Sequence, residues 1–152
     1  MQRVTGTLAA GTWRGASTDA VLLDYDGRHR RRTLLRCVSG RELLLDLAVA
    51  VQLHDGDALQ LEDGSYVEVQ AAAEPLLELR TAGAGALTRL AWHLGNRHVA
   101  AELGADWLRI RPDHVLAELA VRLGASVTAI NAPFEPEAGA YAAHSHALIR
   151  GP

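Results

Sequence analysis

Seven histidines are the main chemical resource of this chain of 152 residues. Neutral imidazole is the commonest protein ligand for nickel, zinc and copper, so the positions of these residues decide whether the chain can hold a transition metal. They are His29, His54, His93, His98, His114, His144 and His146. The single cysteine, Cys37, allows neither a Cys-x-x-Cys pair nor an internal disulfide, so a metal site here depends on imidazole and oxygen.

The pair His144-Ser145-His146 is the sharpest local signal. Residues two apart in an extended chain point to the same side, so both rings can approach one ion. The alternative is an accidental pair or the remnant of an expression tag. Ala147, Leu148 and Ile149 follow in place of further histidines, which argues against a tag. We therefore take His144 and His146 as candidate metal ligands.

His98 directly follows a predicted helix over residues 85–97, so its ring could project from a rigid element toward solvent or a partner. The alternative is an ordinary surface or helix-capping histidine. His93 lies five positions earlier, about 140° around an ideal helix, and cannot share a metal with His98 from one helix face. His114 falls in the first turn of a second predicted helix, where protonation would oppose the helix dipole. A ligating and a purely surface role are equally open for His114.

Composition and motifs exclude several classes of function. Motifs of zinc hydrolases, serine hydrolases and phosphate-binding loops are missing, so we do not expect an enzyme. A net charge of −3 and 5% aromatic residues disfavour nucleic-acid binding. The longest apolar stretch is about a dozen residues and no secretory signal is visible, so we expect a cytoplasmic protein without a membrane partner. The basic run Arg28–Arg32 is usually a solvated hairpin end, and the functional alternative is a surface that docks an acidic protein.

The first 70 residues are predicted to form a small all-β domain. Short apolar strands alternate there with Asp-Gly and Gly-Asp steps, which suit tight turns. The predicted strands are 19–25, 31–38, 42–53, 58–61 and 66–69. The segment Ala71–Pro75 changes the pattern, since proline lacks an N–H and disfavours helix at the residue before it. A domain boundary is expected at this segment.

Beyond Pro75 the pattern predicts the order β-α-β-β-α-β, which is a ferredoxin-like arrangement. The predicted elements are strand 76–80, helix 85–97, strand 99–103, strand 107–111, helix 113–123 and strand 127–130, and Gly124 is expected to end the second helix. The fold class is therefore α+β. We predict three segments: a β-rich partner-binding domain (1–73), a ferredoxin-like domain for metal binding and dimerisation (74–133), and a flexible tail with the His-x-His pair (134–152).

Several stretches give the chain a recognisable family pattern. They are Trp92–Val99 (WHLGNRHV), Asp113–Leu116 (DHVL) and Pro133–Tyr141 (PFEPEAGAY), with Leu44–Leu47, Asp55–Asp57 and Ala72–Pro75 in the first half. The chain resembles the urease accessory protein UreE family of nickel metallochaperones over nearly its whole length. The stretch at Pro133–Tyr141 is the most specific part of that resemblance.

The resemblance implies a homodimer that delivers Ni²⁺ to the urease apoprotein, together with accessory proteins that include a GTPase. His98 matches the central ligand, and two copies of it would share one ion across the dimer axis. His144 and His146 match tail histidines that supplement this site, and His114 matches a secondary position in some members. Pro112 stands where some relatives have another histidine, so the secondary site is in question. The alternative reading is a protein-interaction module, a co-chaperone with incidental histidines.

Two imidazoles leave coordination positions open, which suits a carrier that must release its ion. Imidazole must be neutral to bind metal and its unperturbed pKa is about 6.5, so Ni²⁺ affinity should fall below about pH 6. Zn²⁺ or Cu²⁺ could bind the same ligands in vitro, since copper exceeds nickel in affinity for most nitrogen sites. The choice of nickel therefore rests on the resemblance.

Overall fold

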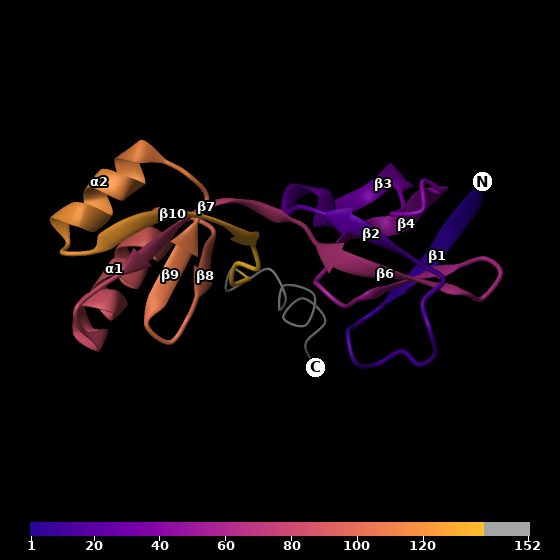
Figure 1. Ribbon diagram of the computed structural model, residues 1–152, viewed down its shortest axis with the longest axis horizontal. Helices are drawn as coiled ribbons and strands as arrows, with labels where there is room; N and C mark the ends of the chain where they lie inside the picture. Colours follow the sequence, from indigo (N-terminus) through magenta and orange to yellow (C-terminus); the bar gives the residue numbers. More distant parts are fainter. Residues whose placement is uncertain (139–152) are drawn as a thin grey trace, which may run out of the picture. The chain divides into compact units, whose positions relative to one another are not determined.

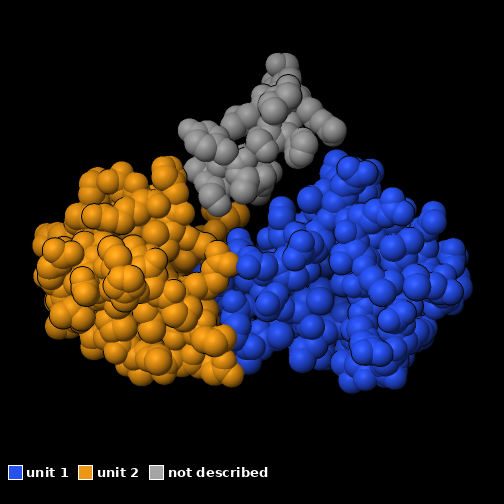
Figure 2. Space-filling model, turned by 90° about the horizontal axis from the view of Figure 1, so that it is seen from above, with its two compact units in different colours: residues 1–74, 132–134 blue, residues 75–131, 135–152 orange. Residues whose placement is uncertain are grey.

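The structure is a computed structural model that describes residues 1–138. The chain forms two compact units, coloured separately in Figure 2. Unit 1 comprises Met1–Glu74 together with Ala132–Phe134, and unit 2 comprises the described residues of Pro75–Asn131 and those from Glu135 onward. The predicted α+β class, with a β-rich first half and a βαββαβ second half, is confirmed.

Unit 1 is built on one six-stranded sheet of order β2-β6-β5-β1-β4-β3 (Figure 1). The strands are β1 (Gln2–Leu8), β2 (Asp19–Leu23), β3 (His29–Arg36), β4 (Glu42–Gln52), β5 (Ala58–Leu61) and β6 (Tyr66–Ala71), and a short 3-10 helix, η1 (Asp26–Arg28), joins β2 to β3. β1 lies at the centre, parallel to β4 and antiparallel to β5. The sequence pattern did not predict β1, because only Val4 of that strand is fully buried and the apolar alternation is weak.

Alternation of buried and partly exposed residues explains why these segments are strands. In β6, the side chains of Val67, Val69 and Ala71 are buried while their neighbours are only partly buried. The turn before β6 places Gly64 at a φ of +85°, which glycine accepts without steric cost. The inward residues of both halves of the sheet form one apolar cluster. That cluster is Val4, Val21, Leu35, Cys37, Leu43, Leu45, Leu53, Leu59, Leu61, Val67 and Val69.

Arg28 is completely buried in unit 1, so the expectation of a solvated hairpin end is wrong for this residue. Its Nε donates to the carbonyl of Leu53 at 3.2 Å and its Nη1 donates to Leu23 at 3.0 Å. Its Nη2 donates to the carbonyl of Phe134, whose ring is also fully buried and meets Tyr25 edge-on at 5.4 Å between ring centroids. A buried guanidinium is tolerated because these backbone acceptors replace its water.

Unit 2 is a four-stranded sheet of order β10-β7-β9-β8 with two helices (Figure 1). Its elements are β7 (Ala73–Arg80), α1 (Ala84–Asn96), β8 (Ala101–Leu103), β9 (Trp107–Ile110), α2 (His114–Arg122) and β10 (Ser126–Pro133). Both helices pack on the same side of the sheet, because they share one cluster with alternate strand residues. Its buried members are Leu79, Leu90, Leu94, Leu108, Ile110, Ala120 and Ala125.

Charged side chains stabilise the strands of unit 2 away from that cluster. Arg109 pairs with Glu78 at 3.0 Å and lies over the ring of Trp107 at 4.1 Å from its centroid. Arg80 also pairs with Glu78 at 2.8 Å, and this hydrogen bond is the main reason that the pKa of Glu78 is lowered. Arg109 thus joins β9 to β7 through its side chain, and Arg80 holds Glu78 from within β7.

The last strand differs most from the sequence prediction, which ended it at Ile130. β10 continues to Pro133, and Phe134 is buried immediately after it. Two prolines and the absence of any period made this stretch look irregular, because the contact that buries Phe134 is formed with residues more than one hundred positions earlier. Local pattern contains no information about such a contact.

Candidate metal-binding histidine and its surroundings

His98 follows α1 in the left-handed backbone conformation, with a φ of 56°. It is the sole non-glycine residue with positive φ among residues 1–138. The His98 N–H donates to the carbonyl of Gly95 at 3.0 Å, and the Val99 N–H donates to Leu94 at 3.1 Å. This pair of hydrogen bonds is a Schellman motif, in which the left-handed position is normally glycine.

The second helix ends in the same motif with the usual residue. Gly124 follows α2 at a φ of +88°, its N–H donates to Val121 at 3.0 Å, and the Ala125 N–H donates to Ala120 at 2.9 Å. The chain therefore uses glycine at one helix end and histidine at the other. Since a left-handed residue with a Cβ costs about 1–2 kcal/mol, His98 occupies a position that backbone energetics alone would give to glycine. Such a local cost is typical of functional positions.

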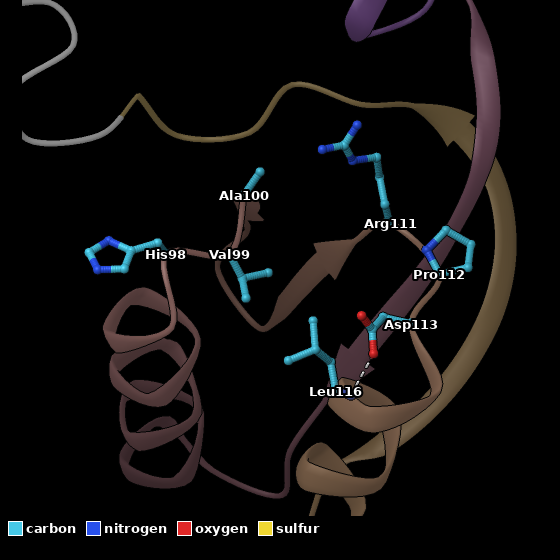
Figure 3. Close-up of a pocket in the computed structure, with 7 residues that line it drawn as sticks. All are labelled: His98, Val99, Ala100, Arg111, Pro112, Asp113 and Leu116. Carbon is cyan, nitrogen blue, oxygen red and sulfur yellow. Dashed lines mark hydrogen bonds between the residues drawn. The ribbon is translucent and has the colours of Figure 1, made fainter.

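The imidazole of His98 is available for a ligand. The residue is exposed, and its side chain forms no hydrogen bond or ion pair within residues 1–138. Figure 3 shows the ring directed away from Asp113 and Leu116. Val99 packs against the apolar cluster of unit 2 beside Leu94, so the helix end that carries the ring is held on a rigid element. Nothing in the described part of the chain competes with a metal for this ring.

A pocket of about 340 Å³ adjoins His98 (Figure 3). It is lined by His98, Val99, Ala100, Arg111, Pro112, Asp113 and Leu116. The carboxylate of Asp113 is already used, because its Oδ1 accepts from the N–H groups of Val115 at 2.9 Å and Leu116 at 3.0 Å. Asp113 is therefore the N-cap of α2, whereas the sequence pattern had placed it inside the first turn. This residue fixes the start of α2 and is poorly disposed to bind a metal.

The other histidines of unit 2 are not gathered around His98. His114 is the first residue of α2 and is exposed. His93 is partly buried and its ring meets that of Trp92 edge-on, with 5.1 Å between centroids. Within residues 1–138, no group of three or more His, Cys, Asp or Glu side chains is arranged to hold a metal ion. A site at His98 with three or more such ligands would therefore need residues of another chain or residues outside the described part.

The predicted ligands His144 and His146 lie outside the described residues. The chain that leads to them is anchored on β8. The Glu135 N–H donates to Oε1 of Glu102 at 2.7 Å, and the Glu137 N–H donates to the carbonyl of Ala101 at 2.9 Å. Because later residues meet earlier positions of β8, the chain runs antiparallel to this strand, toward the end that follows His98.

The left-handed conformation of His98 was the feature that sequence reasoning missed. A signal exists, because Gly95-Asn96-Arg97 contains weak helix formers and Val99 supplies the apolar residue that a Schellman motif places after its left-handed position. The histidine in the place of glycine concealed that signal.

An exposed histidine at a helix end, carried by a unit that is separate from a small β unit, is the arrangement that we expect of an accessory binding protein. Comparison with known families agrees with this class. Residues 1–72 match the family pattern of the UreE urease accessory protein N-terminal domain, and residues 74–149 match that of its C-terminal domain. The chain belongs to the UreE family, whose members are accessory chaperones and not enzymes.

Individual relatives are similar over most of the chain. The urease accessory protein UreE of Bradyrhizobium sp. (strain ORS 278) is 54% identical over 147 residues, which cover 97% of this chain and 70% of the relative. The protein of the same description from Rhodopseudomonas palustris (strain BisB18) is 51% identical, and the match covers 97% of this chain and 72% of the relative. The urease accessory protein UreE of Beijerinckia indica is 47% identical, and the match covers 93% of this chain and 82% of the relative.

Proposed function

We propose that this protein is a nickel carrier for urease maturation, acting in the cytoplasm as a homodimer. His98 of each subunit contributes one imidazole to a single Ni²⁺, which is then passed on during assembly of the urease active site with the help of a GTPase partner. The observation that carries the proposal is the imidazole of His98, which is exposed, has no partner among residues 1–138 and is held on a helix end where glycine would be less strained. Family membership supports the link to urease.

A twofold axis explains how one histidine could suffice. An isologous interface presents the same residue twice, so two imidazoles meet without a second histidine in the chain. Metal binding would then favour the dimer by mass action. Exposed apolar side chains near the two helix ends support an interface there, since Trp92 on α1 is 63% exposed and Val115 on α2 is 57% exposed. Open coordination positions keep the affinity intermediate and allow the ion to be released.

The tail histidines are within reach of the same ion. Glu137 is hydrogen-bonded to Ala101, which is three positions from His98. His144 is seven positions beyond Glu137, and an extended chain spans at most about 3.3–3.6 Å per residue. The seven residues therefore span up to roughly 25 Å, ample for His144 and His146 to complete the coordination. His114 is kept as a secondary site, because it is exposed and belongs, within residues 1–138, to no group of three or more His, Cys, Asp or Glu side chains that could hold a metal.

Native mass spectrometry with added Ni²⁺ tests the proposal, because it reports subunit and metal numbers together. The expected species is a dimer with one tightly held ion. His98→Ala should lose this ion, while the control His93→Ala, a histidine on the same helix, should keep it. Removal of residues 143–152 should weaken nickel binding in calorimetry but leave the dimer. Unchanged nickel binding by His98→Ala would refute the site, and no retained metal in the wild-type protein would favour an interaction module.

A further inference from the structure

All but the last two residues of β3 form an exposed basic edge in unit 1, which we call the β3 edge and define as residues 29–34. Arg30 and Arg31 are exposed and form no ion pair within residues 1–138. Arg32 has only a long contact of 3.9 Å to Asp46, and its side chain is 68% exposed. Three adjacent guanidinium groups thus face solvent on a chain whose net charge is −3. This concentration of positive charge is local and is not shared by the whole protein.

The backbone of the β3 edge is open as well. β3 is the last strand of the six-stranded sheet, with β4 on one side. Within residues 1–138, β2 at the opposite end of the sheet is bonded to this part of the chain only after β3 has ended. The contacts are the bridge between Val21 and Cys37 and the hydrogen bond from the Val38 N–H to the carbonyl of Ala20 at 2.8 Å. An edge strand presents N–H and C=O groups that can pair with an added strand.

The β3 edge is rigid before any partner binds. Arg28, the residue before it, is fully buried with its side chain hydrogen-bonded to three carbonyls, and its own carbonyl accepts from the Leu53 N–H at 2.7 Å. Because β3 is already ordered, binding of an added strand would not include the entropic cost of ordering it.

Apolar side chains lie beside the charges. Leu34 is 51% exposed on β3. In the neighbouring strand, the register passes from Arg30 opposite Val51 to Arg32 opposite Asp46, so residues 47–50 of β4 form a bulge. Val49 in this bulge is 62% exposed. The surface thus offers cations for carboxylates and apolar contacts for the residues between them.

We propose that the β3 edge binds an extended, acidic segment of a partner protein, which adds to the sheet as a seventh strand. The proposal rests on the partner-binding part of the proposed function and names the surface and the chemistry of the partner. Strand addition supplies backbone hydrogen bonds, the carboxylates of the segment pair with the arginines, and its apolar residues contact Leu34 and Val49. A peptide fits better than a nucleic acid, because phosphate-binding surfaces of single strands need aromatic platforms, and no aromatic residue lies within residues 29–36.

Fluorescence anisotropy of the full-length protein with a labelled ten-residue peptide of alternating glutamate and valine tests this. Arg30→Glu/Arg32→Glu should weaken binding about tenfold, because these two side chains share one face of β3 and two attractions of exposed charges become two repulsions. The control Arg14→Glu/Arg89→Glu has the same net charge from exposed arginines elsewhere and should change binding by roughly twofold at most. Both variants should bind nickel as the wild type does, so failure here is distinguishable from failure of the carrier function.

A second peptide separates strand addition from simple charge attraction. N-methylation of every second residue, in each of the two possible phases, removes the N–H groups that would pair with β3, and one phase should abolish binding. Equal binding of both methylated peptides, equal loss in the control variant, or no binding by the wild type would overturn the proposal. Tighter binding of a ten-nucleotide DNA strand at the same arginines would also overturn it, by showing a phosphate-binding surface.

Discussion

Replacing His98 by glycine should separate metal binding from stability. The left-handed backbone at this residue costs about 1–2 kcal/mol when a Cβ is present. Glycine removes that cost, but its greater freedom in the unfolded chain lowers the stability of the folded protein by about 0.4–1 kcal/mol. The imidazole is exposed and has no hydrogen bond within residues 1–138, so little packing is lost with it. We therefore expect His98→Gly to match or exceed the wild-type stability by up to about 1.5 kcal/mol.

His98→Ala and Gly124→Ala provide matched comparisons. His98→Ala keeps the Cβ in the left-handed position, so it should be less stable than His98→Gly by about 1 kcal/mol. Gly124→Ala makes the reverse change in the same motif at the end of α2 and should lose about 1 kcal/mol or more. Both His98 variants should lose the tightly bound Ni²⁺, and Gly124→Ala should keep it.

Urea denaturation gives the free energies of unfolding, and calorimetry gives the nickel affinity of the same preparations. Tryptophan emission is suitable because Trp92 and Trp107 both lie in unit 2. A His98→Gly protein that unfolds more easily than His98→Ala would refute the argument from backbone strain. Retention of the tight ion by His98→Gly would instead refute the role of the imidazole.

Three further predictions concern the framework of the two units. Arg28→Met should lower the free energy of unfolding by at least about 3 kcal/mol in urea denaturation, because three carbonyls each lose a hydrogen bond from the buried guanidinium. Arg30→Met should change it by less than about 0.5 kcal/mol. Asp113→Ala should cost about 1 kcal/mol through loss of the N-cap of α2, and Asp113→Asn should restore most of it; equal losses would contradict the cap. The hydrogen bond from the Ser39 hydroxyl is the main cause that holds the pKa of Asp19 below its usual value of 3.8. This bond stabilises the protein above that pH and is lost as pH falls through the lowered folded pKa, so Ser39→Ala should be less stable at pH 7 and should lose less stability on acidification, as urea titrations at several pH values would show.

Much of the fold follows from local pattern. Asp-Gly turns between alternating apolar residues predicted five strands of unit 1, and helical spacing predicted α1 and α2 to within one or two residues. The predicted end of the second helix at Gly124 is confirmed by its left-handed φ. These features were accessible because each depends on residues that lie within a few positions of one another.

Several features that local pattern missed depend on distant contacts. The burial of Arg28 requires the carbonyl of Phe134, which is 106 positions away, so a residue from a basic run became part of a core. β10 extends to Pro133, and the residue that follows it, Phe134, makes that same contact with Arg28. The exposed position of β3 at the end of its sheet follows from strand order, which a list of strands does not contain.

For the proposed metal site, the sequence by itself determined which residues could bind a cation, since donor chemistry resides in the side-chain types and their spacing. It identified His98 as a ligand candidate just beyond a helix. Only the tertiary structure decided that this histidine is held in a left-handed backbone conformation with its ring exposed and unpartnered in the described chain. The physical reason is that the packing of Val99 beside Leu94 in the core of unit 2 compensates the local strain, and the strength of such packing depends on the assembled fold.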